Sequence, residues 1–581
     1  MQLDLLREIP EDESLRRQWN ALVKRVHRPQ VFYTYEWSLA VQRAYGATLQ
    51  PLLFLARDDK GALCGVAALA SDSARKVSFL CATTGDYCDI LSLPEQKPTI
   101  VAAISAELNR QCLGEITLTN LPADSDTVAA LEQASGHGYY RFVRTAYECA
   151  QVSLPNVERR PGENMLLLPR RKMLRRSLSA MSRDGPVRLD HARSWEQIEP
   201  ILPQFMQAHV ARFLYTGRIS NMAHPERRVF LEQLARLLSQ SGWLTLTRMV
   251  SGNRTLAWNY GFQFEGTWFW YQPSFDSDLE KYSPGFCLLA KIIEEAADDP
   301  ALKVVDLGLG AEEYKDRFAN QVRGTLQVTL APSAIQPARE VLRYRAAEIA
   351  KRSPRLEAGL RFASSFLSRN GIAGGFSQIR KRMKASLWLE TEVSFLEWTG
   401  SAEPDPASTK LEPLDTNHLA SATCQYVDDS ETLAYLLRSA SRLRNGAARG
   451  FGLVAEDGTF LNFVWVSDFD RFFVLELNAK VEAPSSECAL LFDCWTPDAV
   501  RGHEHHVRAL SLVAKRIKEE GKRPWICCTA AGDVFSLQDL ERAGFQQRYS
   551  LKRQRLLGWQ WIKGAIPPPA DARAAEVSAR I

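Results

Sequence analysis

The chain has 581 residues, a length that corresponds to about four average domains. Its 72 Lys and Arg residues and 68 Asp and Glu residues give a formal net charge of +4. Hydrophobic residues make up 45% of the chain and charged residues 24%. This composition excludes a disordered scaffold, a fibre and a uniformly basic nucleic-acid binder.

Three sections of the chain repeat one order of predicted elements, and together they predict an α+β fold. The first section has predicted strands at 51–57, 62–70 and 75–82, a helix at 98–110, a strand at 115–119 and a helix at 126–135. The second has predicted strands at 243–250, 254–264 and 267–272, a helix at 284–297, a strand at 303–309 and a short helix through 312–318. The third has predicted strands at 451–456, 459–468, 471–478 and 489–496, a helix at 502–520, a strand at 524–529 and a helix that ends at 543.

Changes in composition separate these sections. Residues 151–165 form a polar connector that contains Pro, and 401–409 has the sequence of a flexible linker. We therefore predict five parts, which are two units at 1–155 and 160–335, a basic helical connector and linker at 336–409, a third unit at 410–563 and a disordered tail at 564–581.

The sequence contains no signal for export or for a membrane span. No run of about 18 apolar residues occurs, and the N-terminal sequence MQLDLLREIPEDES lacks the pattern of a signal peptide. We therefore expect a cytoplasmic protein. Two stretches, 170–176 and 339–384, are basic enough to meet phosphates, nucleic acid or lipid head groups, although a solvated surface explains them equally well. Peripheral contact with the inner face of the membrane through 339–384 is therefore a further hypothesis.

The second section contains a candidate anion site. Ser283, Pro284 and Gly285 directly precede an apolar helix. Gly allows close approach of a ligand to the backbone, and Pro fits the first helical turn. The free N–H groups of such a helix start bind anions such as a pyrophosphate. The alternative is an ordinary helix start capped by Ser.

Polar residues follow the next predicted strand of this section. Asp306 lies within the strand predicted at 303–309, and Glu313, Tyr314 and Lys315 begin the following helix. Polar groups that gather at the carboxyl end of a strand are candidates for binding or for acid–base chemistry. The alternative is a capped helix with solvated charges.

The third section has a loop at the equivalent position, and it carries Arg501, Gly502, His503, Glu504 and His505. A metal site is one interpretation of this loop. However, residues two apart point to different faces of a helix, and the spacing H-E-x-x-H is absent. We therefore predict an anion-binding loop and no metal.

Read in order, these motifs resemble the BioF2-like acetyltransferases of the GNAT superfamily, the group often called CelD/BcsL. The matching features over 1–335 are the aromatic VFYTYEW, RRKMLRRSLSAMSRDG, His209-x-x-Arg212, Trp258-x-x-Gly261-Phe262, Tyr271, YSPGFCLL and DLGLGAEEYKDRF. The third section resembles an ordinary GNAT domain, with P-x-x-x-R-G before a helix and Ala543-Gly544-Phe545 after another. The resemblance implies three GNAT-like units, the first two paired as in Fem-type transferases.

The resemblance also implies roles for residues. Ser283, Pro284 and Gly285 would bind the pyrophosphate of acetyl-CoA or another acyl-CoA, and the loop at 501–505 would do so in the third unit. The catalytic residues would be Asp306, Glu313, Tyr314 and Lys315. The acceptor would contact the aromatic side chains of Trp37, Trp258 and Tyr271.

Three functions remain open from the sequence. The first is an acyl-CoA-dependent N-acyltransferase that modifies an amine or hydroxyl of a cell-envelope saccharide, an exopolysaccharide or its lipid-linked precursor. The second is a Fem-like transferase that uses aminoacyl-tRNA. The third is a non-enzymatic GNAT-like scaffold of a polysaccharide synthase.

Overall fold

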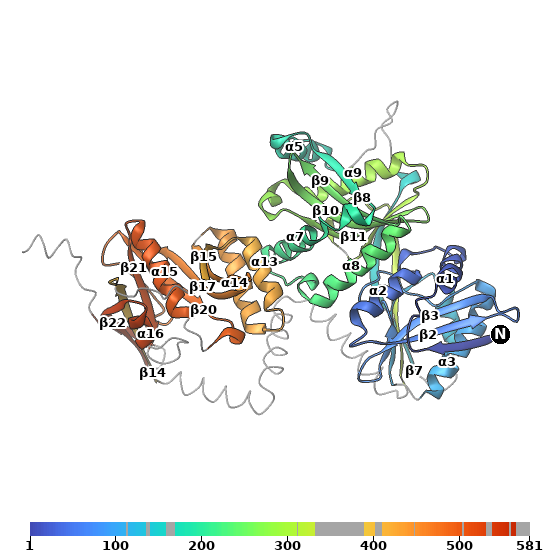
Figure 1. Ribbon diagram of the computed structural model, residues 1–581, viewed down its shortest axis with the longest axis horizontal. Helices are drawn as coiled ribbons and strands as arrows, with labels where there is room; N and C mark the ends of the chain where they lie inside the picture. Colours follow the sequence, from blue (N-terminus) through green and yellow to red (C-terminus); the bar gives the residue numbers. More distant parts are fainter. Residues whose placement is uncertain are drawn as a thin grey trace, which may run out of the picture. The chain divides into compact units, whose positions relative to one another are not determined.

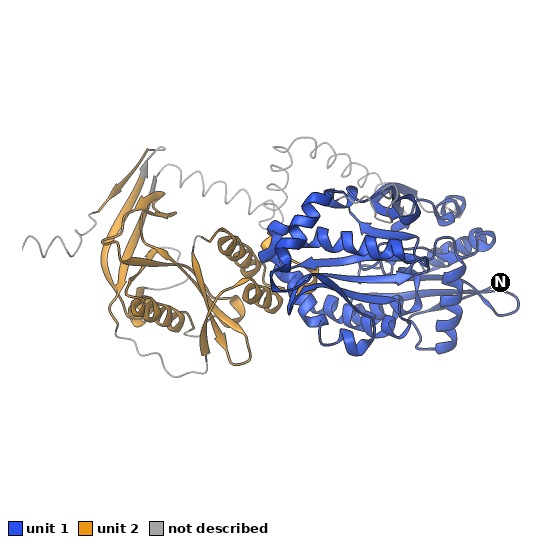
Figure 2. Cartoon of the chain, turned by 90° about the horizontal axis from the view of Figure 1, so that it is seen from above, with its two compact units in different colours: residues 1–212, 224–348 blue, residues 213–223, 349–581 orange. Residues whose placement is uncertain are grey.

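A computed structural model describes residues 1–111, 114–134, 140–157, 169–310, 312–331, 388–400, 409–446, 448–501, 505–529, 537–556 and 559–564. The chain divides into two compact units, coloured separately in Figure 2. Unit 1 comprises residues 1–212 and 224–348, and unit 2 comprises residues 213–223 and 349–581. Among the described residues, no helix combines the length and the hydropathy that crossing a membrane requires. The basic stretch at 339–384 lies outside the described residues.

Unit 1 is built on one sheet of 13 strands (Figure 1). Its order is β1-β2-β3-β4-β6-β13-β7-β12-β11-β10-β9-β8, and β5 pairs with β3. The strands are β1 (Gln2–Leu6), β2 (Gln50–Arg57), β3 (Leu63–Ser71), β4 (Val77–Phe79), β5 (Leu91–Ser92), β6 (Ile116–Pro122), β7 (Tyr140–Ser153), β8 (Arg188–Ala192), β9 (Leu244–Ser251), β10 (Arg254–Phe264), β11 (Thr267–Phe275), β12 (Val304–Leu309) and β13 (Gln321–Ala331). The predicted α+β fold is confirmed.

Helices accompany this sheet in both halves of unit 1. They are α1 (Glu13–Arg25), α2 (Tyr35–Tyr45), α3 (Lys97–Arg110), α4 (Asp126–Ala134), α5 (Arg171–Met181), α6 (Trp195–Ile198), α7 (Leu202–Tyr215), α8 (Pro225–Gln240), α9 (Pro284–Asp298) and α10 (Glu313–Asp316). Helix α9 buries nine of its side chains, among them Leu288, Leu289 and Ile292, against strands of the second half. Burial of this apolar face fixes the position of the first turn of α9.

The two halves of unit 1 exchange their last strands. β7, from the first half, pairs with β12, while β13, from the second half, lies between β6 and β7. The pairing of β13 with β7 runs from Gln321↔Gln151 to Ala331↔Tyr140. Residues 151–153, which we predicted to be part of a connector, therefore belong to a strand. Their ladder partners lie far away in the sequence, which no local pattern reveals.

The parallel strands β11 and β12 separate along their length. They pair only from Thr267↔Val304 to Phe269↔Asp306, although β11 continues to Phe275 and β12 to Leu309. The ladder between β12 and β7 also has an irregularity between Asp306 and Leu309. Unpaired backbone groups therefore face an opening in the sheet at the end of β12.

Unit 2 has a sheet of eight strands in the order β15-β16-β17-β20-β21-β14-β22-β23. Its strands are β14 (Trp388–Trp398), β15 (Thr409–Pro413), β16 (Arg449–Ala455), β17 (Phe460–Asp468), β20 (Cys488–Trp495), β21 (Arg523–Thr529), β22 (Phe545–Leu556) and β23 (Trp559–Lys563). Its helices are α13 (Thr416–Gln425), α14 (Ser430–Asn445), α15 (His505–Glu519) and α16 (Leu537–Arg542). A separate hairpin joins β18 (Phe472–Val474) to β19 (Ala479–Val481).

Two features of unit 2 differ from the sequence prediction. Residues 388–398, predicted to belong to the helical connector, form β14 between β21 and β22. Their alternation places Val393 and Phe395 in the core, which favours a strand. Residues 471–478 were predicted to be one strand of the main meander. They instead contribute only Phe472–Val474 to the separate hairpin, where Arg471 and Asn478 have positive φ.

Candidate functional site

A cavity of about 220 Å³ lies at the start of α9. Ser283, the residue before the helix, has left-handed backbone angles (φ 52°, ψ 55°), and Pro284 occupies the first turn. Ser283 and Gly285 both line the cavity. The N–H groups of a helix start and the positive end of its dipole favour an anion at this place.

Three arginines line the same cavity. They are Arg170, Arg212 and Arg317, and among the described residues that line the cavity only Glu280 is acidic. The Arg212 guanidinium donates to the Pro273 carbonyl at 2.7 Å and lies 4.7 Å from the ring centre of Phe275. These contacts orient a planar, charged group of the kind that binds phosphates in two-point geometry. The three arginines and the start of α9 therefore give this cavity a positively charged lining.

Tyr314, one of the predicted catalytic residues, lines this cavity together with Trp270. The Trp270 indole N–H donates to the Tyr314 hydroxyl at 3.2 Å. Burial raises the pKa of Tyr314 above its usual value. The hydroxyl therefore keeps its proton at neutral pH and is available as a hydrogen-bond donor.

Asp306 lies where β11 and β12 separate, and it is almost completely buried, with 1% of its surface exposed. Its carboxylate accepts hydrogen bonds from the Gly308 N–H at 2.9 Å, from Gln151 Nε2 at 2.7 Å and from the Tyr87 hydroxyl at 2.9 Å. Burial raises the pKa of Asp306, while these three donors act in the opposite direction.

A second carboxylate, Asp86, lies beside Asp306 and comes from the first half of unit 1. A Cβ placed on Gly308 would lie 2.5 Å from Asp86 Oδ2 and 3.7 Å from the Trp270 carbonyl oxygen. Burial, followed by the charge of Asp306, raises the pKa of Asp86 to about 7. We did not predict Asp86, because its sequence context, a short turn between strands, gives no signal of chemistry.

Lys315 and Glu313, also predicted to be catalytic, occupy different environments. Lys315 is buried, donates to the Leu309 carbonyl at 2.9 Å and forms an ion pair with Glu312 at 3.2 Å. Its charge acts on Asp86. Glu313 is exposed and pairs with Arg317. The structure therefore brings Lys315 to the carboxylate pair, whereas Glu313 is not among the residues that line the cavity and reaches only Arg317, which does.

Gly308 has a role that a side chain would disturb. Its φ of 71° is left-handed, and a Cβ would collide with Asp86 Oδ2. We expect Gly308→Ala to lower the free energy of unfolding by about 2–3 kcal/mol, the sum of backbone strain and displacement of the carboxylate. Gly61→Ala is the matched control, because Gly61 has a φ of 80° and open space around it. Urea unfolding of both variants would measure the difference, and equal losses would contradict the proposed collision.

The predicted acceptor-binding aromatic residues lie in the core. Trp37 is completely buried, and its indole N–H donates to Thr84 Oγ1 at 3.1 Å. Tyr271 accepts from Arg227 Nη2 at 2.7 Å and donates to the Thr84 carbonyl. Trp258 is 4% exposed and lies near Phe205, with ring centres 6.2 Å apart. None of the three is among the residues that line the cavity at α9.

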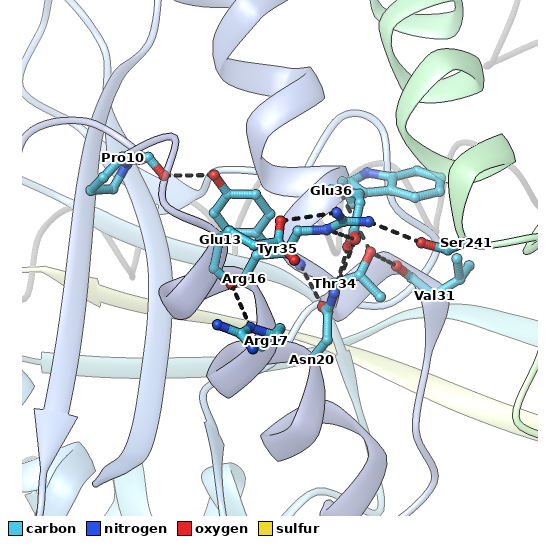
Figure 3. Close-up of polar contacts among 11 residues, drawn as sticks. Pro10, Glu13, Arg16, Arg17, Asn20, Val31, Thr34, Tyr35, Glu36 and Ser241 are labelled. Atoms are coloured by element: carbon cyan, nitrogen blue, oxygen red, sulfur yellow. Dashed lines mark hydrogen bonds and ion pairs between the residues drawn. The ribbon is translucent and has the colours of Figure 1, made fainter.

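The segment that contains Glu36 also takes part in joining the two halves of unit 1 (Figure 3). Glu36 is completely buried and accepts from Arg16 Nε at 2.7 Å and from Asn20 Nδ2 at 2.9 Å. Arg16 Nη2 donates to Ser241 Oγ at 3.2 Å, which links α1 to the second half. The aromatic VFYTYEW segment therefore has a demonstrable packing role.

In unit 2, the predicted loop is described only in part. Gly502, His503 and Glu504 lie outside the described residues. Arg501 forms an ion pair with Asp498 at 2.8 Å, and His505 begins α15. β20 and β21 pair only from Cys488↔Arg523 to Leu491↔Ile526, and a cavity of about 460 Å³ lies where they separate. Within the described part of the chain, no group of three or more His, Cys, Asp and Glu residues is arranged to hold a metal.

Comparison with known proteins gives one family match. Residues 169–316 match the acetyltransferase (GNAT) domain family. No curated protein matches the sequence significantly.

Several solved structures are similar to parts of the chain. FemX is 9% identical and covers 59% of this chain and 99% of its own, with a TM-score of 0.38. A tandem GNAT protein from the clavulanic acid biosynthesis pathway is 12% identical and covers 57% and 99%, with a TM-score of 0.35. L-PGS from Bacillus licheniformis is 11% identical and covers 52% and 95%, with a TM-score of 0.35. From the family match, residues 169–316 form a GNAT acetyltransferase domain, and the protein is an acyltransferase.

Proposed function

We propose that unit 1 transfers an acyl group from acyl-CoA to an amine. The observation that carries the proposal is the cavity at α9, where a helix start and three arginines surround a space large enough for a pyrophosphate. A phosphate-bearing donor fits this charge, and Ser283, Pro284 and Gly285 would contact its pyrophosphate. Arg170, Arg212 and Arg317 would neutralise it.

The opening between β11 and β12 supports a path for the reactive end of the donor. Trp270 belongs both to the cavity and to the stretch of β11 that has left its partner strand. A thioester that follows this stretch would approach the carboxylate pair beyond it. The Tyr314 hydroxyl, which keeps its proton, would donate a hydrogen bond to the departing sulfur. On the acceptor side, the negative charge of Asp306 and the positive charge of Lys315 would balance each other.

For the acceptor, we propose the amine, or with lower preference a hydroxyl, of a cell-envelope saccharide, an exopolysaccharide or its lipid-linked precursor. An acyl-CoA donor places this reaction in the cytoplasm. Contact of residues 339–384 with anionic lipid at the inner membrane face would bring the enzyme to a lipid-linked acceptor.

Isothermal titration with acetyl-CoA tests the donor site. We expect wild-type protein to bind, and we expect Gly285→Trp to weaken binding at least about tenfold, because the new side chain would fill the cavity. A Cβ on Gly285 would already lie 3.3 Å from the Phe275 ring. Val229→Trp, on an exposed position of α8, is the matched control. Absence of wild-type binding, or equal binding by Gly285→Trp, would contradict the proposal.

A competition experiment separates the two phosphate-bearing donors. Deacylated tRNA should not displace acetyl-CoA from the wild-type protein. Tight binding of tRNA that weakens steeply with salt, without binding of acetyl-CoA, would instead favour an aminoacyl-tRNA donor. Mass spectrometry of products formed from acetyl-CoA with glucosamine or with glucose would then distinguish amine from hydroxyl acceptors.

A further inference from the structure

Two carboxylates from different halves of unit 1 meet at the opened end of β12. Asp306 belongs to β12, while Asp86 belongs to the turn between β4 and β5. The charge of Asp306 acts on Asp86, and a Cβ on Gly308, two residues after Asp306, would lie 2.5 Å from Asp86 Oδ2. A pair of carboxylates in one enclosed site does not readily hold two negative charges, so one of them takes up protons near neutral pH.

The two carboxylates differ in how they are held. Asp306 is almost completely buried and accepts three hydrogen bonds, which favour its charged form. Asp86 is only partly buried, and the Leu309 backbone N–H donates to it. Asp306 is thereby fixed, while Asp86 retains exposed surface. Asp86 is therefore the member of the pair that can exchange a proton with a bound molecule.

The position of Asp86 matches the proposed path of the donor. The same Cβ on Gly308 would lie 3.7 Å from the Trp270 carbonyl oxygen. Trp270 follows directly after Phe269, the last residue of β11 that pairs with β12. Asp86 thus borders the space between the separated strands, while the Trp270 indole binds Tyr314 at the cavity.

The charges around Asp86 come from several elements. The titratable groups that act on it or feel its charge are Asp306, Lys315, Arg227, Cys149, Tyr271 and Cys88. Burial raises the pKa of Cys149 to about 12, and the pKa values of Tyr271 and Cys88 are also raised, so these three stay neutral. Burial and then the charge of Asp306 raise the pKa of Asp86, and Lys315 and Arg227 lower it, with the result of about 7.

We propose that Asp86 is the general base of the acyl transfer and that the first half of unit 1 completes the active site by supplying it. This role rests on the proposed function. The Asp86 carboxylate takes one proton from the acceptor ammonium group and later releases it to solvent. The free amine attacks the thioester carbon and forms a C–N bond. As the C–S bond breaks, the nitrogen loses a second proton and the thiolate takes it up, so that the products are an amide and free CoA.

The test compares rate–pH profiles of full-length variants with acetyl-CoA and glucosamine as probes. In the wild type, kcat/KM should rise as pH increases through about 7, because only ionised Asp86 accepts the proton. Asp86→Asn should lower kcat/KM about 100-fold at about pH 8, a typical loss for a general base. Its affinity for acetyl-CoA should stay unchanged. Asp126→Asn, on an exposed position of the first half, is the matched control.

The Lys315→Met variant provides a measurement that would not change if Asp86 had only a structural role. It removes a positive charge that lowers the pKa of Asp86, so the rise in kcat/KM should shift to higher pH. Titration of the acceptor amine itself would not shift between variants. An unshifted profile, or full activity of Asp86→Asn with retained acetyl-CoA binding, would overturn the role of Asp86 alone. Failure of the wild type to bind acetyl-CoA would overturn the proposed function, and the role of Asp86 with it.

Discussion

Dividing the chain between residues 157 and 169 should produce two fragments, 1–157 and 169–581, whose parts of unit 1 fold only together. In fragment 1–157, β7 would lose both of its neighbours, β12 and β13, and β6 would lose β13. In the other fragment, β13 would lose both of its neighbours, β6 and β7. Long strands without partners expose backbone donors and acceptors and favour aggregation. Each fragment expressed alone should therefore be largely insoluble, whereas coexpression should give a soluble pair that binds acetyl-CoA.

The control cuts the chain at the same place after the protein has folded. A protease site inserted between residues 157 and 169 and cut in the purified protein should leave both pieces associated in size-exclusion chromatography, because the ladder from Gln321↔Gln151 to Ala331↔Tyr140 holds them. Independent folding of fragment 1–157, shown by a cooperative thermal transition, would contradict the importance of the exchange. Separation of the pieces after cleavage would contradict it as well.

Local sequence signals predicted the parts of the fold that depend on neighbours in the chain. The hairpin between β10 and β11 turns at Glu265 and Gly266, which have φ values of 43° and 79°, and Gly at such a turn is visible in the sequence. Helix α9 was visible because Pro284 precedes a periodic apolar run. The exchange of β7 and β13 was not visible, because any apolar strand of sufficient length could occupy those positions.

The same distinction applies to the candidate site. Ser283, Gly285 and Tyr314 lie close in sequence to the helix starts that position them, and the structure places all three at one cavity. Trp37 looked like a contact for an acceptor, yet an aromatic residue in an apolar segment is most often in the core, and it is completely buried. Asp86 was missed because the raised pKa comes from its burial and from Asp306, which lies in the other half of unit 1, and neither is visible in its local sequence.

Asp86→Asn should also stabilise the protein at high pH, while it lowers activity. The pKa of Asp86 is raised from 3.8 to about 7 in the folded state, so the folded chain holds a proton that the unfolded chain has released between these two values. The contribution of Asp86 to the free energy of unfolding is fully present below about pH 4. It decreases as pH rises and is lost once pH has passed about 7. The difference sets a ceiling of about 4 kcal/mol on the loss.

Asn imitates the protonated carboxyl and carries no charge at any pH. At about pH 3, Asp86→Asn and the wild type should therefore unfold at similar urea concentrations, because Asp86 is protonated in both the folded and the unfolded chain. At about pH 8, the variant should be more stable by about 2 kcal/mol, since it avoids a buried charge beside Asp306. The exposed Asp126→Asn control should show no such dependence. A gain of equal size at both pH values would mean that Asp86 has the same pKa in the folded and the unfolded chain, and such a residue would not give the rate–pH profile expected of the base. The lower stability of the wild type at high pH and the proposed chemistry of Asp86 have one cause, because the burial and the nearby charge of Asp306 that weaken the fold also bring the pKa of this proton acceptor to about 7.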